Sequence, residues 1–215
     1  MTRLSRKEIL QDFRTRSLLE ATRKIIATEG FDAVTMERVA KEAGITKGAI
    51  YLYFRNKDQL ILSAVEEIAL EMLQEIQAHL DHKAPPWERL CQVVRAQIEI
   101  MERHQELLRT LLLDRRLLRD SPKGRQSRLL FKHRERHEGF LKNILDAGTR
   151  QKIFAPMDTA AAAFYINKMA ISTAENRMLG LSELPLEKDT HRLIRFLALL
   201  LRHKRPNPYG SNGKG

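Results

Sequence analysis

Apolar residues recur along this chain at spacings of three and four, which is typical of helices that bury one face. No strand-like alternation of apolar and polar positions is found, and no Asn-Gly or Asp-Gly hairpin turn separates two apolar runs. The pattern therefore predicts an all-α fold of about nine helices and no sheet. The expected ranges are 6–29, 36–43, 47–53, 57–80, 87–101, 104–119, 125–148, 158–179 and 186–203.

Residues that begin and end helices support these ranges. Ser5 and Asn56 are N-cap residues that are followed three positions later by Glu or Gln, the signature of a helix start. Pro85-Pro86 ends the long fourth helix, and residues 121–124 (Ser-Pro-Lys-Gly) form the clearest loop of the C-terminal half. Residues 206–215 are expected to be a disordered tail.

The stretch from Thr35 to Phe54 has the arrangement of two short helices joined by a tight turn. Thr35 is the N-cap candidate of the first helix. Gly44 stands where a helix end needs left-handed backbone, which glycine adopts without steric cost. Ile45 then fills the turn, and Thr46 caps the second helix. This is the helix-turn-helix arrangement, whose second helix enters the major groove of DNA.

The second helix of this motif separates core positions from outward positions. Ile50 and Phe54 are expected to point to the core. The outward positions are Lys47, Gly48, Ala49, Tyr51 and Tyr53. The two small residues permit a close approach, the lysine can reach phosphate or guanine, and the tyrosine hydroxyls can reach phosphates. The alternative is that the tyrosines join Phe54 in an aromatic core cluster, but their place opposite Ile50 and Phe54 favours DNA.

The charge distribution points in the same direction. The net charge is +11, and residues 1–63 hold 12 Lys and Arg against 8 Asp and Glu, whereas residues 64–120 hold 8 against 11. A basic N-terminal segment followed by an acidic one suggests that the N-terminal end meets a polyanion. The alternative is a basic surface that only keeps the protein soluble, and charge alone does not separate the two.

Several classes of protein are excluded by what the sequence lacks. No apolar run approaches the ~18 to 20 residues needed to span a bilayer, and the first thirty residues contain no export signal. A single cysteine, Cys91, excludes a disulfide framework, so the protein is expected in the cytoplasm. His133 and His137 have the spacing of a helical metal pair but lack a third ligand, so no metal is expected. No catalytic constellation is found, and neither an enzymatic activity nor a cofactor is expected.

The motif residues resemble the DNA-binding domain of the tetracycline-repressor (TetR) family from Leu18 to Leu60. The matching elements are Ala27-Thr28-Glu29-Gly30-Phe31, Val34-Thr35, Val39-Ala40, Ala43-Gly44-Ile45, Lys47-Gly48, Ile50-Tyr51, Tyr53-Phe54 and Asn56-Lys57. Few families share this combination at this spacing. A weaker resemblance covers Gly148–Phe154 with Asp158, which is similar to the loop before the eighth helix of many members.

The resemblance implies DNA contacts position by position. Thr35 corresponds to a helix-capping residue that touches phosphate, and Tyr53 to a backbone contact. Lys57 matches a lysine that holds a phosphate at the start of the fourth helix. The recognition-helix positions are Thr46, Lys47, Gly48 and Tyr51. Leu52 departs from the family pattern, which often has an aromatic or polar residue there, so no polar contact is assigned to it.

The resemblance also implies that residues 1–63 form the DNA-binding domain and residues 64–205 an effector-binding and dimerisation domain. Small residues in the helices near 158–179 and apolar residues near 186–203 predict a helix–helix interface, either between two copies or within one chain. Candidate effector contacts are Met101, Leu112, Phe131, Arg134, His137, Phe140, Tyr165 and Met169. The alternative is an ordinary core, with Arg134 on a solvated basic face. Arg134 and His137 are the candidates for an anionic ligand.

Together these observations predict a homodimeric repressor that binds a palindromic DNA operator and is released by a small-molecule effector. One alternative is a DNA-binding protein of the same fold without an effector, which a test for ligand-induced release of DNA would separate. The other is a helical scaffold without specific DNA binding. Cys91 is expected to be a small buried residue, although a redox role stays open.

Overall fold

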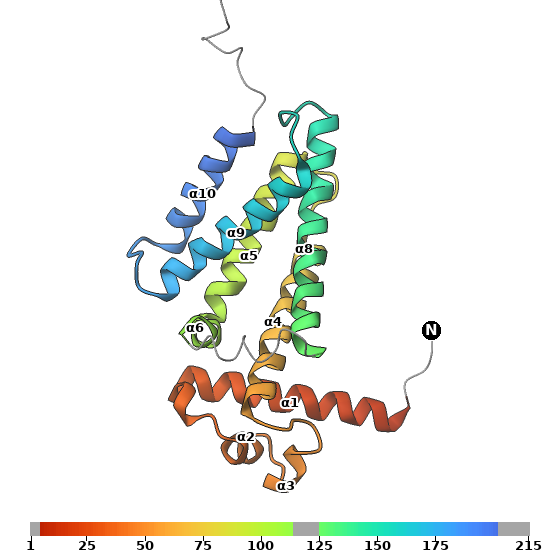
Figure 1. Ribbon diagram of the computed structural model, residues 1–215, viewed down its shortest axis with the longest axis vertical. Coiled ribbons are helices and arrows are strands. Elements are labelled where there is room, and N and C mark those ends of the chain that lie inside the picture. The colour runs from red at the N-terminus through yellow and green to blue at the C-terminus, as the bar shows by residue number, and fades with distance from the viewer. Residues whose placement is uncertain (1–4, 114–124, 202–215) are drawn as a thin grey trace, which may run out of the picture. The chain divides into compact units, whose positions relative to one another are not determined.

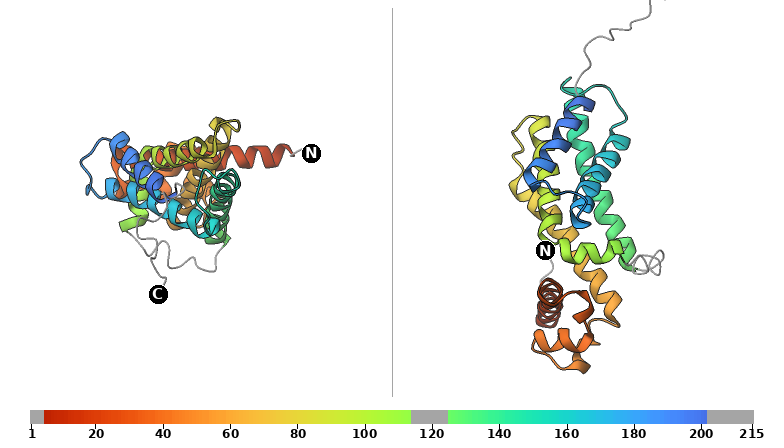
Figure 2. Two further views of the ribbon diagram at one scale, coloured as in Figure 1. Left: turned by 90° about the horizontal axis from the view of Figure 1, so that it is seen from above. Right: turned by 90° about the vertical axis from the view of Figure 1, so that its left-hand side faces the viewer.

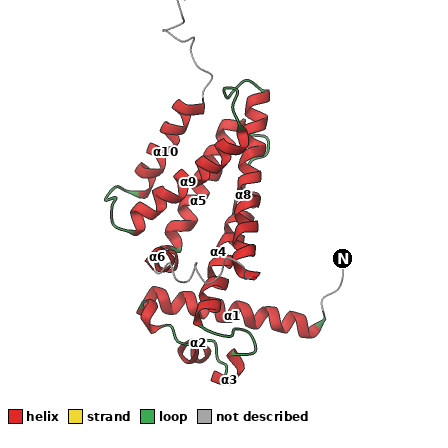
Figure 3. Cartoon of the chain, in the orientation of Figure 1, coloured by secondary structure: helices red, strands yellow, loops and turns green. Residues whose placement is uncertain are grey.

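The computed structural model describes residues 5–113 and 125–201, and these fold into helices and connecting turns without a strand (Figure 3). This part of the chain contains nine α-helices and one short 3-10 helix, η1 (Figure 1). The predicted all-α class is confirmed. The bounds are α1 Arg6–Glu29, η1 Phe31–Ala33, α2 Met36–Glu42, α3 Lys47–Ile50, α4 Lys57–His79, α5 Pro86–Arg103, α6 Gln105–Leu113, α8 Arg125–Arg150, α9 Thr159–Met178 and α10 Leu186–Leu201.

Most helix ends lie close to the predicted positions, and the clearest difference is in the motif. The helix predicted over 47–53 ends at Ile50, and residues 51–53 form a turn instead. The predicted loop at 121–124 and the predicted tail at 206–215 lie outside the described residues, as do the predicted ends of the helices over 104–119 and 186–203.

The chain packs into two compact units, each built from two stretches of sequence. The first unit comprises the described parts of residues 1–73 and 100–134, and the second those of 74–99 and 135–215. The helices α4, α5 and α8 are continuous across the points where one unit gives way to the other. The domain boundary expected between residues 63 and 64 falls inside α4, about four helical turns before the end of that helix at His79.

The core of the first unit is apolar and joins α1 to the motif. Leu18 and Ile25 of α1, Val39 of α2, Ile50 of α3 and Leu60 of α4 are all almost fully buried and belong to one cluster. Figures 1 and 2 show α2 and α3 on the same side of α1. Because each short helix contributes only one or two buried side chains, α2 and α3 depend on this shared core for their stability.

Local capping signals define the start and end of α1 as the sequence predicts. The Ser5 hydroxyl accepts a hydrogen bond from the Glu8 backbone N–H at 3.2 Å, and the Glu8 carboxylate accepts one from the Ser5 N–H at 2.7 Å. This is a complete capping box. At the other end, Gly30 has φ +85°, and its N–H bonds to the Ile26 carbonyl at 3.1 Å.

The second unit has a closely packed corner before α9. The ring of Phe154 is buried and lies so near Gly148 of α8 that a Cβ there would come within 2.1 Å of it. Asp158 then caps α9, because its carboxylate accepts hydrogen bonds from the Ala160 and Ala161 N–H groups at 3.0 Å each. In Figures 1 and 2, α9 leads through a short loop into α10, which packs beside it.

Candidate functional site

The two helices of the motif are capped by the residues that the sequence indicates. The Thr35 hydroxyl accepts a hydrogen bond from the Arg38 N–H at 3.0 Å, which starts α2. The Thr46 hydroxyl accepts one from the Ala49 N–H at 3.2 Å, which starts α3. Each cap satisfies a donor that a helix start leaves without a partner, so both starts are fixed in place.

The turn between α2 and α3 has the left-handed glycine that the sequence predicts. Gly44 has φ +68°, and its N–H donates to the Lys41 carbonyl at 3.2 Å. The N–H of Ile45 donates to the Ala40 carbonyl at 2.9 Å. These two bonds form a Schellman motif, which ends α2 and redirects the chain into α3. The helix-turn-helix prediction is confirmed at this level of backbone geometry.

The second helix of the motif is a single helical turn followed by a tight turn. The N–H of Leu52 donates to the Ala49 carbonyl at 3.1 Å, and the N–H of Tyr53 donates to the Ile50 carbonyl at 3.0 Å. These bonds span three residues rather than four, so the backbone tightens after Ile50. The helix ends early because the chain must turn to Asn56, whose side chain accepts a hydrogen bond from the Gln59 N–H at 2.8 Å at the start of α4.

The division between core and surface positions follows the prediction. Ile50 and Phe54 are buried, whereas the Tyr51 side chain is half exposed and Leu52 is 80% exposed. Gly48 lies on open surface, because a Cβ built there would meet no atom within 4 Å. The first turn of α3 and the residues after it therefore present a surface of small, polar and aromatic groups together with the aliphatic Leu52.

Lys47, the central charged residue of this surface, is held by an acid of α2. Its Nζ lies 2.9 Å from Oε2 of Glu37, and both side chains are well exposed. The hydrogen bond from Lys47 lowers the pKa of Glu37, and that bond raises the pKa of Lys47. The sequence analysis assigned Lys47 to DNA and did not identify Glu37 as its partner.

Tyr53 and Lys57 are less exposed than their predicted role in DNA binding suggests. Tyr53 is partly buried and packs against the apolar core, so the core reading left open for it is correct in part. The Lys57 ammonium donates to the Phe31 carbonyl at 3.0 Å and lies 4.0 Å from the centroid of the Phe31 ring. Burial lowers the pKa of Lys57. Lys57 thus ties the start of α4 to η1.

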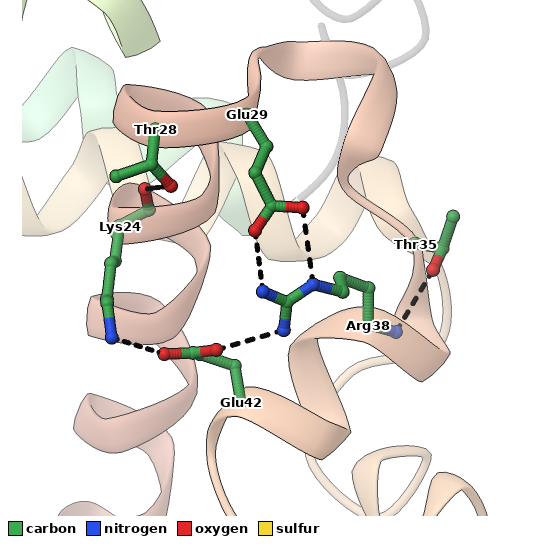
Figure 4. Close-up of polar contacts among 6 residues, drawn as sticks. All are labelled: Lys24, Thr28, Glu29, Thr35, Arg38 and Glu42. Atoms are coloured by element: carbon green, nitrogen blue, oxygen red, sulfur yellow. Dashed lines mark hydrogen bonds and ion pairs between the residues drawn. The ribbon is translucent and has the colours of Figure 1, made fainter.

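Where α2 of the motif faces α1, Arg38 is the centre of an ion-pair network between the two helices (Figure 4). Its guanidinium bonds to the carboxylates of Glu29 and Glu42, and Glu42 also pairs with Lys24. Hydrogen bonds from Lys24 and then from Arg38 lower the pKa of Glu42. Figure 4 also shows Thr35 bonding to the Arg38 backbone, so one residue links the cap of α2 to α1. The spacing of Arg38 and Glu42 is the signal that sequence reasoning could have used.

The eight candidate effector contacts are divided between the two units. Met101, Leu112 and Arg134 are half-buried in the first unit, and the Phe131 side chain lies outside the described part. In the second unit, Phe140 and Met169 are half-buried, but Tyr165 is 62% exposed and does not line the interior of this unit. The described clefts of this unit lie elsewhere. They are lined in part by Ile76 and Val93, by Asn176 and Phe196, and by Arg95 and His191.

His137 differs most from its prediction, because it is almost completely buried and neutral. Its Nε2 lies 2.9 Å from Oε1 of Gln97, whose Nε2 donates to Oδ1 of Asn167 at 2.9 Å. The Asn167 amide in turn donates to the Glu138 carboxylate at 3.1 Å. Burial lowers the pKa of His137 to about 4. A buried neutral imidazole carries no positive charge, so this arrangement does not support a contact between His137 and an anionic ligand at neutral pH.

Two further expectations concern Cys91 and metals. Cys91 is half-buried, and burial raises the pKa of its thiol, which lowers the fraction of reactive thiolate. Among the described residues, no group of three or more His, Cys, Asp or Glu side chains is placed to hold a metal ion. No described helix is long and apolar enough to cross a bilayer.

Comparison with known proteins identifies both halves of the chain. Residues 18–64 match the family model for bacterial regulatory proteins of the tetR family, and residues 83–175 match that for the tetracyclin repressor-like C-terminal domain. The uncharacterized HTH-type transcriptional regulator YerO of Bacillus subtilis is 34% identical over 100 residues, which are 45% of this chain. That match spans 34% of the length of YerO.

Solved structures share the fold over most of the chain. FadR from Bacillus subtilis in complex with stearoyl-CoA has a TM-score of 0.69 at 20% identity and covers 85% of this chain and 97% of its own. AibR in complex with isovaleryl coenzyme A and operator DNA has a TM-score of 0.63 at 20% identity, with the same coverage. The chain therefore belongs to the tetracycline-repressor (TetR) family of helix-turn-helix transcriptional regulators.

Proposed function

We propose that this protein binds a palindromic operator as a homodimer, with α3 in the major groove, and that a small-molecule effector releases it. The observation that carries the proposal is the surface at the start of α3, where Thr46 caps the helix and Lys47, Gly48 and Tyr51 are exposed. The cap satisfies a backbone donor at the helix start, and the exposed side chains there can reach base edges and phosphates.

Phosphate contacts are proposed for residues around this surface. Thr35 lies at the start of α2, where backbone N–H groups favour an anion. Tyr53 is half-buried, so its ring rests on the core while its hydroxyl serves as the donor. Lys57 has three donor hydrogens, and its bond to the Phe31 carbonyl uses one of them. A phosphate can therefore bind Lys57 without breaking that bond.

A dimer through α9 and α10 is supported by apolar side chains on their surfaces. The exposed residues are Phe164 and Tyr165 of α9, Phe196, Leu199 and Leu200 of α10, and Leu179 and Leu181, which follow directly after α9. A single chain that exposes this much apolar surface on two adjacent helices is typical of an interface. Leu197 is buried within its own chain, so an interface variant should replace Leu199 or Leu200 instead. A two-fold dimer must place its recognition helices ~34–36 Å apart to meet successive major grooves.

For the effector, we propose an acyl-coenzyme A as the first class to examine. Two proteins of the same fold were solved with stearoyl-CoA and with isovaleryl coenzyme A, and these ligands differ greatly in the length of the acyl chain. The second unit, which contains the half-buried candidate residues Phe140 and Met169, is the proposed binding region.

The test begins with selection of bound duplexes from random-sequence DNA, followed by titration of the selected site. Tyr51→Ala should reduce affinity for that site by ~10–100-fold and relax the preference at particular base pairs. Lys57→Ala should lower the affinity for the selected site and for unrelated DNA by similar factors. It should also make the slope of log affinity against log salt shallower by about 0.9 per subunit.

Lys41→Ala is the matched control, because Lys41 is an exposed lysine in the last turn of α2. Failure to enrich any sequence would contradict the proposed operator binding. A selected site that no acyl-coenzyme A of short or long chain releases would contradict the proposed effector class.

A further inference from the structure

Glu37 and Lys47 stand in the first turns of the two helices of the motif. Glu37 is the second residue of α2, and Lys47 is the first residue of α3. Their 2.9 Å ion pair joins the two helix starts across ten residues of sequence. The carboxylate is favourable at the start of α2, where the helix dipole is positive, so Glu37 stays ionised when the pair opens.

The surroundings of the pair leave Lys47 accessible to DNA. The Lys47 side chain is 62% exposed and that of Glu37 is 68% exposed, so neither is covered by the rest of the first unit. The neighbouring acids of this region, Glu29 and Glu42, pair with Arg38 on the side of α1. The carboxylate of Glu37 is thus placed beside the residue that the proposed function assigns to reading DNA.

The two kinds of DNA contact open to Lys47 affect this pair differently. A phosphate is itself an anion, and bringing it to the lysine places it beside the Glu37 carboxylate, which repels it. A base edge is neutral, and guanine offers O6 and N7 as acceptors. Because an ammonium has three donors, Lys47 can keep its bond to Glu37 and still donate to guanine. The pair therefore penalises phosphate contacts and permits base contacts.

We propose that Glu37 is a specificity-determining residue. Its carboxylate disfavours contacts between Lys47 and phosphates, and it leaves Lys47 able to contact a base edge in the operator. The proposal rests on the proposed function, namely that α3 reads DNA. It predicts that Glu37 lowers the affinity for unrelated DNA while it leaves operator affinity nearly unchanged. Its effect on sequence preference must pass through Lys47 and disappear when that lysine is removed.

The experiment compares Glu37→Gln with the wild-type protein on two duplexes, the site selected by the wild-type protein and an unrelated sequence of equal length. Glu37→Gln should raise affinity for unrelated DNA by about tenfold and for the selected site by less than about threefold, so that the ratio between them falls. For unrelated DNA, the slope of log affinity against log salt should become steeper by up to about 0.9 per subunit, because Lys47 now releases a counterion from phosphate.

Removal of any acid near DNA also weakens repulsion, and a double variant separates that effect from the proposed one. In a Lys47→Met background, Glu37→Gln should change the affinity for both duplexes by the same small factor. Asp32→Asn is a second control, because Asp32 is an exposed acid of η1 that acts on the charge of Lys57 and not on that of Lys47, so its removal should change the affinity for both duplexes by similar factors. Glu37→Gln and Asp32→Asn both replace exposed side chains, so they should leave the melting temperature unchanged. An unchanged melting temperature shows that altered binding is not a folding defect.

Two results would overturn the proposal. In the first, Glu37→Gln changes both duplexes equally, with or without Lys47, so Glu37 acts only as a diffuse negative charge. In the second, Glu37→Gln weakens the selected site and leaves unrelated DNA unchanged, so Glu37 itself contacts the operator. Both results require a wild-type protein that selects a site. If the wild-type protein selects none, it is the proposed function that fails.

Discussion

Two groups of polar side chains, one in each unit of this protein, are placed in opposite surroundings. Around the motif in the first unit, Lys47 pairs with Glu37 at the surface, with both side chains more than half exposed. In the second unit, His137, Gln97 and Asn167 form a hydrogen-bonded chain in which each residue is no more than 2% exposed. The first arrangement remains in water, and the second has lost its contact with water.

This difference decides what each group of side chains can do. An exposed ion pair contributes little to stability, because water and salt replace it at small cost. Such a pair also stays accessible to DNA, as the exposed side chains of Lys47 and Glu37 are. A buried polar group that loses its partner cannot turn to water, so the loss costs about 1–3 kcal/mol for each group. The hydrogen-bonded series of His137, Gln97 and Asn167 therefore fixes how α5, α8 and α9 pack. These side chains are poorly suited to exchange partners.

The sharpest test of this comparison removes the buried hydrogen bond between His137 and Gln97. His137→Leu should lower the free energy of unfolding by about 2–3 kcal/mol, because it leaves the buried Gln97 oxygen without the partner at 2.9 Å that it has in His137. His137→Gln is the matched control, since its amide can still donate to Gln97, and it should lose clearly less. Denaturant unfolding measures both. Equal losses for the two variants would show that the hydrogen bond contributes nothing.

The pH dependence of the free energy of unfolding should reveal the burial of His137 without removing its side chain. The pKa of His137 in the folded protein is about 4, below its ordinary value of 6.5, so only the unfolded chain takes up a proton between these values. Stability is therefore fully present above pH 6.5 and is lost as the pH falls toward 4, at about 1.4 kcal/mol per pH unit.

The difference in stability between the wild-type protein and His137→Gln isolates this effect. The subtraction is needed because burial raises the pKa of Glu66 to about 7, and that carboxyl changes stability in the opposite direction over the same range. A difference that stays constant from pH 7 to pH 4.5 would contradict the buried neutral imidazole.

In the first unit, the backbone should be more sensitive than the exposed ion pairs. Gly44→Val should lower the free energy of unfolding by about 2 kcal/mol, because a β-branched residue is strained at a φ of +68°. Gly48→Ala is the matched control in the next helix, where a Cβ meets no other atom, and it should not destabilise the protein. Thermal unfolding compares the two. A harmless Gly44→Val would mean that the turn adopts another conformation.

The smallest effect is expected from the surface network behind the motif. Arg38→Met removes the bonds to Glu29 and Glu42 and should change the melting temperature less than Gly44→Val does. The change should shrink further at about 0.5 M salt, where screening is strong. If Arg38→Met matched the loss of His137→Leu, the contrast between exposed and buried polar groups would not hold for this protein.

The sequence by itself determined the features that depend on neighbours within about one helical turn. The capping box at Ser5, the caps at Thr35 and Thr46 and the left-handed Gly44 all follow from residues a few positions apart. The periodicity of three and four also placed Ile50 and Phe54 in the core, because a helix repeats its faces over that interval.

Only the tertiary structure decided which distant polar groups meet. Lys57 reaches the Phe31 carbonyl 26 residues away, and His137 reaches Gln97, which is 40 residues away. Such pairs depend on how helices pack, and no local pattern encodes that packing. For the same reason the sequence did not reveal that Lys47 is bound to Glu37 or that His137 is neutral, since burial and partner choice arise only once the helices have come together.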